Sequence, residues 1–281
     1  MNRLLAANFA RLWRSKIFYG LELFMIGYCM LFYRDAYITI NVNHKEYSNW
    51  NTGFFGGLLP GGIALAVFIS FYIGAEYSNG TIRNKIATGH SRFHIYLSNL
   101  FVCYGAAVIM MMTYCVTSLL IGFILIGKEA ISGIWKPAQG IGMMLCILMA
   151  YTAILVFVAM LDMNIARTGV VSLLLTILLL AAGIMVIQYL EMPEYMVRLE
   201  EVQDESGETK TVERTVYNSK YLSGEKRELY EWAKLILPSA QVMEVINRDV
   251  EYSVKQPICM FGELLIFTGA GIWIFLRKDI K

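Results

Sequence analysis

The sequence EYSNGTIRNKIATGHSR, from Glu76 to Arg92, is a long polar run between two hydrophobic segments. It begins where the apolar run AVFISFYIGA ends at Ala75, and the next apolar run begins at Ile95. Gly80 and Gly89 permit turns that residues with a Cβ atom resist. The residues between them, TIRNKIA, can form about two helical turns with their isoleucines four apart on one face. We therefore expect a short helix across the mouth of two membrane spans, where a cytosolic partner can contact it. The alternative is a solvated connecting loop.

The composition is that of a membrane protein. Of the 281 residues, 57% are hydrophobic and 16% are charged, whereas a soluble domain has about 25% charged residues. The net charge of +2 gives no sign of a nucleic-acid partner. The five cysteines lie in or beside apolar runs and form no CxxC motif, so we expect buried thiols and no disulfide framework or zinc site.

Motifs for catalysis or metal binding are missing from the sequence. It contains no HExxH and no GxSxG. GFILIGKE, at 122–129, has the spacing of a phosphate-binding loop, but Glu129 replaces the required Ser or Thr and the run ends a membrane span. His90 and His94 are four apart without a third ligand, which favours interfacial polar residues over a metal site. We expect no catalytic residues, no metal site and no cofactor on this chain, and hence not an enzyme.

Six apolar runs are long enough to cross a bilayer. The transmembrane helices are expected at 17–33, 56–75, 97–126, 138–161, 168–190 and 257–276. Between the first two we expect an irregular polar loop at 35–55, and Pro60 among glycines indicates a kinked or broken outer end of the second span.

Two segments outside the spans have structure of their own: the first 16 residues and the long segment before the last span. Residues 1–16 place Leu4, Phe9 and Leu12 at helical spacing among basic residues, which is typical of an amphipathic interfacial (elbow) helix. Residues 191–256 form a soluble insertion. In it, 196–202 and 209–217 alternate around DESGE and predict a β-hairpin.

Two short helices should follow this hairpin. Ser223 can cap the first, which carries Leu229, Trp232, Ala233 and Ile236 on one face. Pro238 should end it, and Ser239 can cap the second, which runs through Ile246.

The charges of the soluble segments predict the orientation. Residues 1–16 carry four basic and no acidic residues, the loop 76–94 nets +2, and the tail 277–281 nets +2. Residues 191–256 have nine basic and fourteen acidic residues, a net charge of −5. By the positive-inside rule, both termini and the loop 76–94 are cytoplasmic and 191–256 is extracellular.

The expected fold class is therefore an all-α membrane protein with six transmembrane helices, an N-terminal amphipathic interfacial helix and an extracellular α+β insertion between helices 5 and 6. Its parts are 1–16, the helices 1–5 in 17–190 with the loop 76–94, the extracellular domain 191–256, and the last helix with its cytoplasmic tail in 257–281.

The pattern E-Y-x-x-G-T-x-R-x-x-I-x-x-G-x-S-R over 76–92 resembles the second-to-third-span region of ABC-2 type permeases, the membrane subunits of one class of bacterial ATP-driven exporters. The resemblance implies that this loop contacts an ATPase subunit. The motif positions that it marks for ATPase coupling are Glu76, Gly80, Thr81, Arg83, Gly89, Ser91 and Arg92. The LPSAQ run at 237–241 is similar to permeases linked to antimicrobial-peptide (lantibiotic) export and immunity.

The resemblance also implies an assembly. Two ATP-binding subunits would supply ATP hydrolysis and bind ATP and Mg, and a second permease chain, identical or paralogous, would complete the path in the bacterial plasma membrane. The substrate class would be a peptide, an antibiotic or an amphipathic, lipid-like molecule.

Two acidic residues lie inside expected spans: Glu22 in the first and Glu263 in the last. A carboxylate is costly in lipid, so each should face protein or water. They either fix helix packing through hydrogen bonds or line a translocation path. They lie at different depths and should not pair directly.

A different function remains open on the sequence alone. The chain can instead be a membrane-anchored sensor or scaffold whose extracellular domain binds a ligand without transport. An adjacent gene for an ATPase with a Walker A motif would favour transport, and an adjacent kinase gene alone would favour sensing. An intramembrane enzyme is disfavoured by the missing motifs.

Overall fold

A computed structural model describes residues 1–42, 50–128, 138–162, 164–203, 209–247 and 253–279. Its helices and strands are α1 (Asn2–Leu12), α2 (Lys16–Asn41), α3 (Trp50–Phe55), α4 (Leu58–Ser78), α5 (Thr81–Ala87), α6 (Arg92–Leu125), α7 (Ala138–Leu161), α8 (Ile165–Leu190), β1 (Tyr195–Gln203), β2 (Thr209–Tyr217), α9 (Gly224–Ile236), α10 (Pro238–Asn247) and α11 (Lys255–Arg277).

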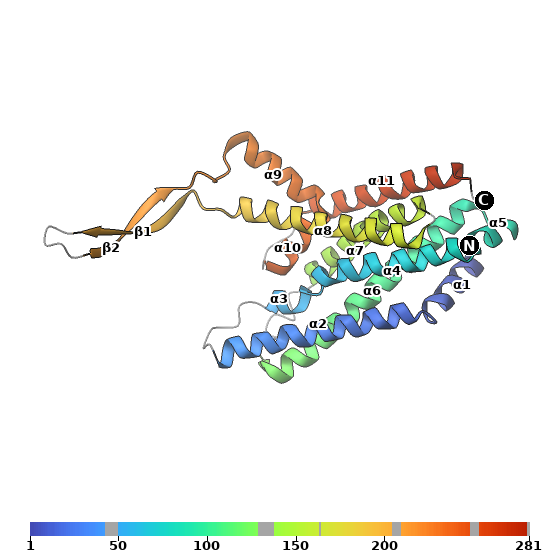
Figure 1. Cartoon of the computed structure of the whole chain (residues 1–281), viewed down its shortest axis with the longest axis horizontal. Helices are drawn as coiled ribbons and strands as arrows, with labels where there is room; N and C mark the ends of the chain where they lie inside the picture. The colour runs from blue at the N-terminus through green and yellow to red at the C-terminus, as the bar shows by residue number, and fades with distance from the viewer. Residues whose placement is uncertain (43–49, 129–137, 163, 204–208, 248–252, 280–281) are drawn as a thin grey trace.

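The long helices form an elongated bundle, with both termini and α5 at one end and the β-hairpin at the other (Figure 1). We call the end with both termini the terminal end and the end with the β-hairpin the hairpin end. Six helical stretches in the described residues are long and apolar enough to cross a membrane, which confirms the predicted number of spans. The span formed by α3 and α4 and the span formed by α7 are the most buried, each with 67% of its apolar window inside the protein.

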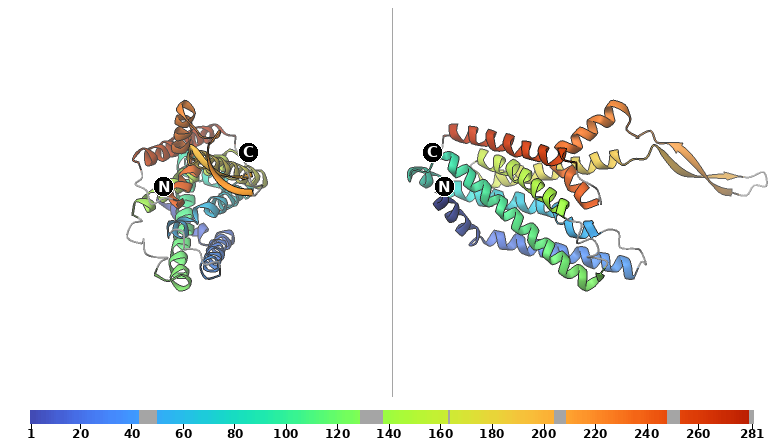
Figure 2. Two further views of the ribbon diagram at one scale, coloured as in Figure 1. Left: turned by 90° about the vertical axis from the view of Figure 1, so that its left-hand side faces the viewer. Right: turned by 180° about the vertical axis from the view of Figure 1, so that it is seen from behind.

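The other spans surround these two and leave apolar side chains on the outer surface. Helix α11 packs on α7, α4 packs on α8, and α2 packs on α6 (Figure 2). Only 22–33% of the apolar windows of α2, α6, α8 and α11 is buried. The exposed apolar surface of these four helices fits contact with lipid, since a helix that is hydrophobic on all sides is stable only in a protein core or a membrane.

Two details of the first spans differ from the prediction. Helix α2 continues past Arg34 and Asp35 to Asn41, so the expected irregular loop is wrong for its first part, and α3 occupies its last part. Residues 43–49 lie outside the described residues. The charged pair ends the apolar run without ending the helix, because hydropathy and helix propensity are separate properties.

The second span is interrupted at its hairpin end, as predicted, and the break lies at Gly56 and Gly57 between α3 and α4. A Cβ atom on Gly57 would come within 2.4 Å of the Tyr114 ring, so the close contact with α6 requires glycine. Pro60 lies in the first turn of α4, where its missing N–H is tolerated.

The predicted β-hairpin is confirmed. Strands β1 and β2 pair antiparallel from Tyr195 opposite Tyr217 to Gln203 opposite Thr209, and they project away from the bundle (Figure 1). The expected turn DESGE, at 204–208, lies outside the described residues.

The two predicted helices of the insertion are present, with different starts. Ser223 stands at the N-cap of α9 but makes no capping hydrogen bond with its side chain. Helix α10 begins at Pro238, so Ser239 lies inside the helix and does not cap it. The prediction of a Ser239 cap is therefore wrong, because Pro at the first helical position already starts the helix. Helix α10 packs against α8, where Gly183 is too close to Ser239 for any side chain.

Candidate functional site

The polar segment between α4 and α6 forms one short helix, α5, between two turns at the terminal end. Gly80, the N-cap of α5, has a left-handed backbone (φ 66°), and Gly89 makes the turn after the helix (φ 89°). These are conformations that favour glycine. Ser91 caps α6, where its hydroxyl accepts a hydrogen bond from the backbone N–H of His94 at 3.3 Å. The predicted short helix is confirmed as Thr81–Ala87. Its Ile82 is buried, and Ile86 packs against the core.

Glu76, in the last turn of α4, is the centre of a buried polar cluster. Its side chain is 0% exposed. Arg11 Nη1 of α1 lies 2.6 Å from Glu76 Oε1, and Lys85 of α5 forms a second ion pair with the same oxygen. Asn99 Nδ2 of α6 donates to Glu76 Oε2 at 2.7 Å. Both carboxylate oxygens therefore have partners, as a buried carboxylate requires.

Asn8 joins α1 to this cluster a second time. Its Nδ2 donates to Asn99 Oδ1 at 3.1 Å and to Ser98 Oγ at 3.0 Å. Its Oδ1 accepts from Lys85 Nζ at 2.9 Å. Its backbone carbonyl accepts from the hydroxyl of Tyr72, on α4, at 2.7 Å. We call Asn8, Arg11, Glu76, Lys85 and Asn99 the Glu76 cluster; its side chains come from α1, α4, α5 and α6.

The electrostatics of the Glu76 cluster favour a rigid structure. Two cations share one carboxylate, so removal of the carboxylate would leave both cations without a counter-charge. Burial lowers the pKa of Lys85 and the neighbouring Glu76 carboxylate opposes that shift. Breaking a buried pair by removing one partner is strongly destabilising. The cluster therefore fixes the position of α5 relative to α1, α4 and α6.

Arg92 makes a second connection at the terminal end. Its guanidinium donates to the carbonyl oxygens of Phe275 at 3.0 Å, Leu276 at 3.1 Å and Lys278 at 2.5 Å. Lys278 in turn donates to the carbonyl oxygens of Met160 at 3.0 Å and Leu161 at 2.9 Å. A cation at a helix C-terminus satisfies the last carbonyl groups and the helix dipole. These contacts tie the start of α6 to the ends of α11 and α7.

The seven residues predicted for ATPase coupling divide into two groups. Glu76 is buried in its cluster and Arg92 is bound to the end of α11. Arg83, Gly89 and Ser91 are exposed, and Gly80 and Thr81 are half-buried. No hydrogen bond or ion pair joins the Arg83 side chain to another residue in the part of the chain that the structure describes. Arg83 is therefore exposed on α5, whereas Glu76 is buried and pairs with Lys85 of the same helix.

Sequence reasoning missed Asn8, Arg11, Lys85 and Asn99 as members of this site. One signal was present: Asn8 lies between Leu4 and Leu12 at spacings of four, on the stripe that the helix buries. A polar residue on a buried stripe needs a hydrogen-bonding partner. Arg11 was placed with the basic surface of the elbow helix, where it would face solvent.

Glu22 and Glu263 lie far apart on different helices. Glu22 is about 9 Å along α2 from Lys16, and Glu263 is about 12 Å along α11 from Lys255, at a rise of about 1.5 Å per residue. Helix α2 begins at the terminal end and α11 begins at the hairpin end (Figure 1), so Glu22 and Glu263 lie nearer to opposite ends of the bundle. Both are half-buried. Both carboxylate oxygens of Glu22 and Oε2 of Glu263 are buried and make no hydrogen bond with another described residue.

Comparison with protein families gives one match to report. The family described as ABC-2 family transporter protein matches residues 4–183. The matched segment contains every residue of the Glu76 cluster as well as Arg83 and Arg92. The β-hairpin, α9, α10 and α11 lie beyond it. No curated protein matches the chain.

Proposed function

The chain belongs to the ABC-2 family of transporter proteins, and from this membership we propose that it is the permease subunit of an ATP-driven exporter. In this proposal the six spans contribute to the translocation path, and a separate ATP-binding subunit supplies the energy. The permease itself does not hydrolyse ATP. The terminal end faces the cytoplasm of a bacterial cell, and the hairpin end faces outward.

One observation carries the proposal: α5 has an exposed surface, and the Glu76 cluster attaches it to the neighbouring helices. A subunit that transmits force needs a surface that the ATPase contacts and a rigid connection from that surface to the spans. Arg83 and the turns at Gly80 and Gly89 provide the surface. The ion pair of the half-buried Lys85 of α5 with the buried Glu76 of α4 provides the connection, because Glu76 is also bound to α1 and α6. A push on α5 would therefore move these helices together.

Arg92 extends this connection to the other side of the bundle. Because it holds the last carbonyl groups of α11, movement of the α5–α6 turn would reach α11 and, through Lys278, α7. Alternating access commonly proceeds by rocking of rigid groups of helices against one another. In this proposal, the contacts of Arg92 and Lys278 would connect two such groups at the terminal end.

A complete transporter would contain two permease chains, identical or paralogous, and two ATP-binding subunits with ATP and Mg. Two of the six spans, α3–α4 and α7, are mostly buried among the others, so we propose a path between two chains. A peptide, an antibiotic or a lipid-like molecule suits a path that opens toward the bilayer, as the exposed apolar faces of α2 and α8 would allow.

This function can be tested by isolating the tagged chain from native membranes in mild detergent and measuring ATP hydrolysis in the purified sample. We expect a co-purified protein with a Walker A motif and ATP hydrolysis that vanadate inhibits. After reconstitution into vesicles, ATP should drive movement of substrate. A chain that purifies alone from native membranes and supports no ATP hydrolysis would contradict the proposal and leave the sensor or scaffold alternative.

A further inference from the structure

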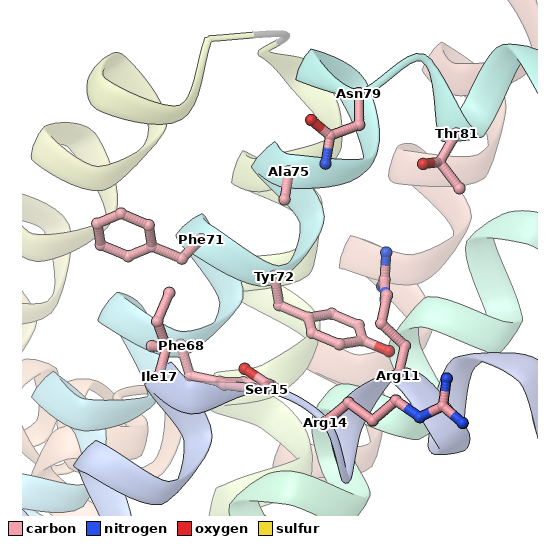
Figure 3. A pocket seen from close by; sticks show the side chains of 10 residues that line it. All are labelled: Arg11, Arg14, Ser15, Ile17, Phe68, Phe71, Tyr72, Ala75, Asn79 and Thr81. Atoms are coloured by element: carbon pink, nitrogen blue, oxygen red, sulfur yellow. The ribbon is translucent and has the colours of Figure 1, made fainter.

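A cavity of about 240 Å³ lies at the elbow between α1 and α2, with α4 as its opposite wall (Figure 3). Its polar lining includes Arg11, Arg14, Ser15 and Thr81, and its apolar lining includes Phe68 and Tyr72. None of the residues that line it is acidic. We call it the elbow cavity. It lies beside the Glu76 cluster, with which it shares Arg11.

The guanidinium of Arg11 can donate more hydrogen bonds than it makes to the described residues. Its guanidinium lies over the Tyr72 ring at 3.7 Å, and Nη1 pairs with Glu76. The remaining nitrogens, Nε and Nη2, are buried without a hydrogen-bond partner among the described residues. Buried donors of this kind are normally satisfied. A guanidinium offers a fork of donors that matches phosphate oxygens.

The charge balance at the cavity is positive. Among the described residues, the carboxylate that pairs with Arg11 is that of Glu76, which already accepts from Lys85 and Asn99. Arg14, on the same side of the elbow, is exposed and adds a second guanidinium to the lining. An anion entering the cavity would meet two positive groups, a hydroxyl from Ser15 and a hydroxyl from Thr81.

The position of the cavity identifies the source of the anion. It lies where α2 begins and α4 ends, so it is at the level where two spans leave the bilayer. Its outer wall is apolar and open, since Ile17 is 40% and Phe71 is 44% exposed. Trp13 and Tyr19 are exposed beside it, as is typical of residues at the membrane interface. Basic pockets between spans at this level are suited to lipid headgroups.

We propose that the elbow cavity binds the phosphate of an anionic phospholipid, with the acyl chains leaving past Ile17 and Phe71. The volume is below the range of about 300–1,000 Å³ that holds a whole drug-sized ligand, and it suits a headgroup whose chains remain in the bilayer. A free phosphate would use the same donors but not the apolar opening. This proposal is independent of the transport function, because it rests on the cavity alone.

The test uses the full chain purified in a zwitterionic detergent with phosphatidylcholine. Phosphatidylglycerol is added, and bound lipid is measured by native mass spectrometry together with the melting temperature. We expect retention of phosphatidylglycerol over phosphatidylcholine and a higher melting temperature. Arg14→Gln should weaken binding by about five-fold, as expected for one interfacial charge. Ala75→Leu, which fills the cavity and keeps every charge, should abolish the preference.

The matched control is Arg3→Gln, which removes an exposed charge of α1 outside the cavity and should leave binding unchanged. Inorganic phosphate, added at millimolar concentration in place of the lipid, should not raise the melting temperature. Equal losses in Arg3→Gln and Arg14→Gln would show a general surface-charge effect and overturn the proposal. Unchanged lipid preference in a folded Ala75→Leu protein, or equal stabilisation by inorganic phosphate, would also overturn it.

Discussion

Arg11 of α1 and Glu76 of α4 form an ion pair at 2.6 Å in which the carboxylate is fully buried. This pair attaches the N-terminal helix to the end of the second span. The same carboxylate holds Lys85 of α5, so one acidic side chain determines where three helices meet. The first helix is thus part of the packed terminal end, in addition to any contact that it makes with the membrane surface.

Replacing Glu76 by Gln should destabilise the chain strongly. The substitution keeps the shape of the side chain but removes the counter-charge of Arg11 and Lys85, whose side chains are 32% and 12% exposed. The cost should approach the value of about 3–5 kcal/mol for a fully buried pair. Denaturant unfolding in detergent, or the melting temperature, measures the effect. Glu231→Gln is the control, because Glu231 pairs with Arg227 on the surface of α9 at 3.3 Å, where loss of a pair costs only about 0–1 kcal/mol. Equal stability of the two variants would show that the Glu76 cluster does not hold the terminal end together.

Replacing Arg92 by Gln should loosen the end of α11. The variant removes the donors for the carbonyl oxygens of Phe275, Leu276 and Lys278. Amide hydrogen exchange over 273–279 should become faster by about ten-fold, the change that corresponds to about 1.4 kcal/mol. Arg83→Gln serves as the control, since Arg83 is exposed on the same segment. Unchanged exchange in Arg92→Gln would show that these hydrogen bonds do not stabilise the end of α11.

The orientation can be tested with single cysteines in a background without the native ones. Glu213 on β2 and Ser78 at the end of α4 are both exposed and lie at opposite ends of the molecule. In intact cells an impermeant thiol reagent should label Glu213→Cys and should leave Ser78→Cys unlabelled. Labelling of Ser78→Cys alone would reverse the proposed orientation.

Glu22 and Glu263 can be assigned a role by paired substitutions. If they fix helix packing, Gln should preserve export and Leu should lower the amount of protein in the membrane. If they meet a cationic or amphipathic substrate, Gln should lower export while the amount of protein holds. An uncompensated carboxylate at the centre of a membrane span costs about 2.5–3.5 kcal/mol. Full export at normal abundance by both Leu variants would exclude both roles.

The sequence predicted those parts of the fold that are encoded locally. The six spans follow from continuous hydropathy, α5 follows from two glycines around an isoleucine pair, and β1 and β2 follow from alternation. The continuation of α2 to Asn41 was missed because its charged residues end the apolar run. The start of α10 was misplaced because Pro238 was interpreted only as a helix breaker.

The candidate site was predicted only in part, for a physical reason. The motif of 76–92 drew attention to Glu76, but its partners come from α1 and α6. Local sequence patterns carry no information on which distant side chain meets a buried carboxylate. The division between supporting residues, such as Glu76, and exposed residues, such as Arg83, depends on burial, which only the three-dimensional structure gives.

The most direct test of the central claim is the recovery of the ATP-binding subunit with Arg83→Glu. The variant reverses the charge of an exposed α5 residue whose side chain makes no hydrogen bond or ion pair within the described chain. The permease should therefore fold and reach the membrane normally. Lys226→Glu, at the opposite end of the molecule on α9, makes the same charge change as a control. We predict that Arg83→Glu lowers the amount of co-purified ATPase, or its substrate-stimulated ATP hydrolysis, by about ten-fold or more, the change that a loss of about 1.4 kcal/mol produces, while Lys226→Glu retains both. Unchanged assembly and unchanged ATP hydrolysis with Arg83→Glu would contradict the claim that α5 couples the ATPase to the membrane spans.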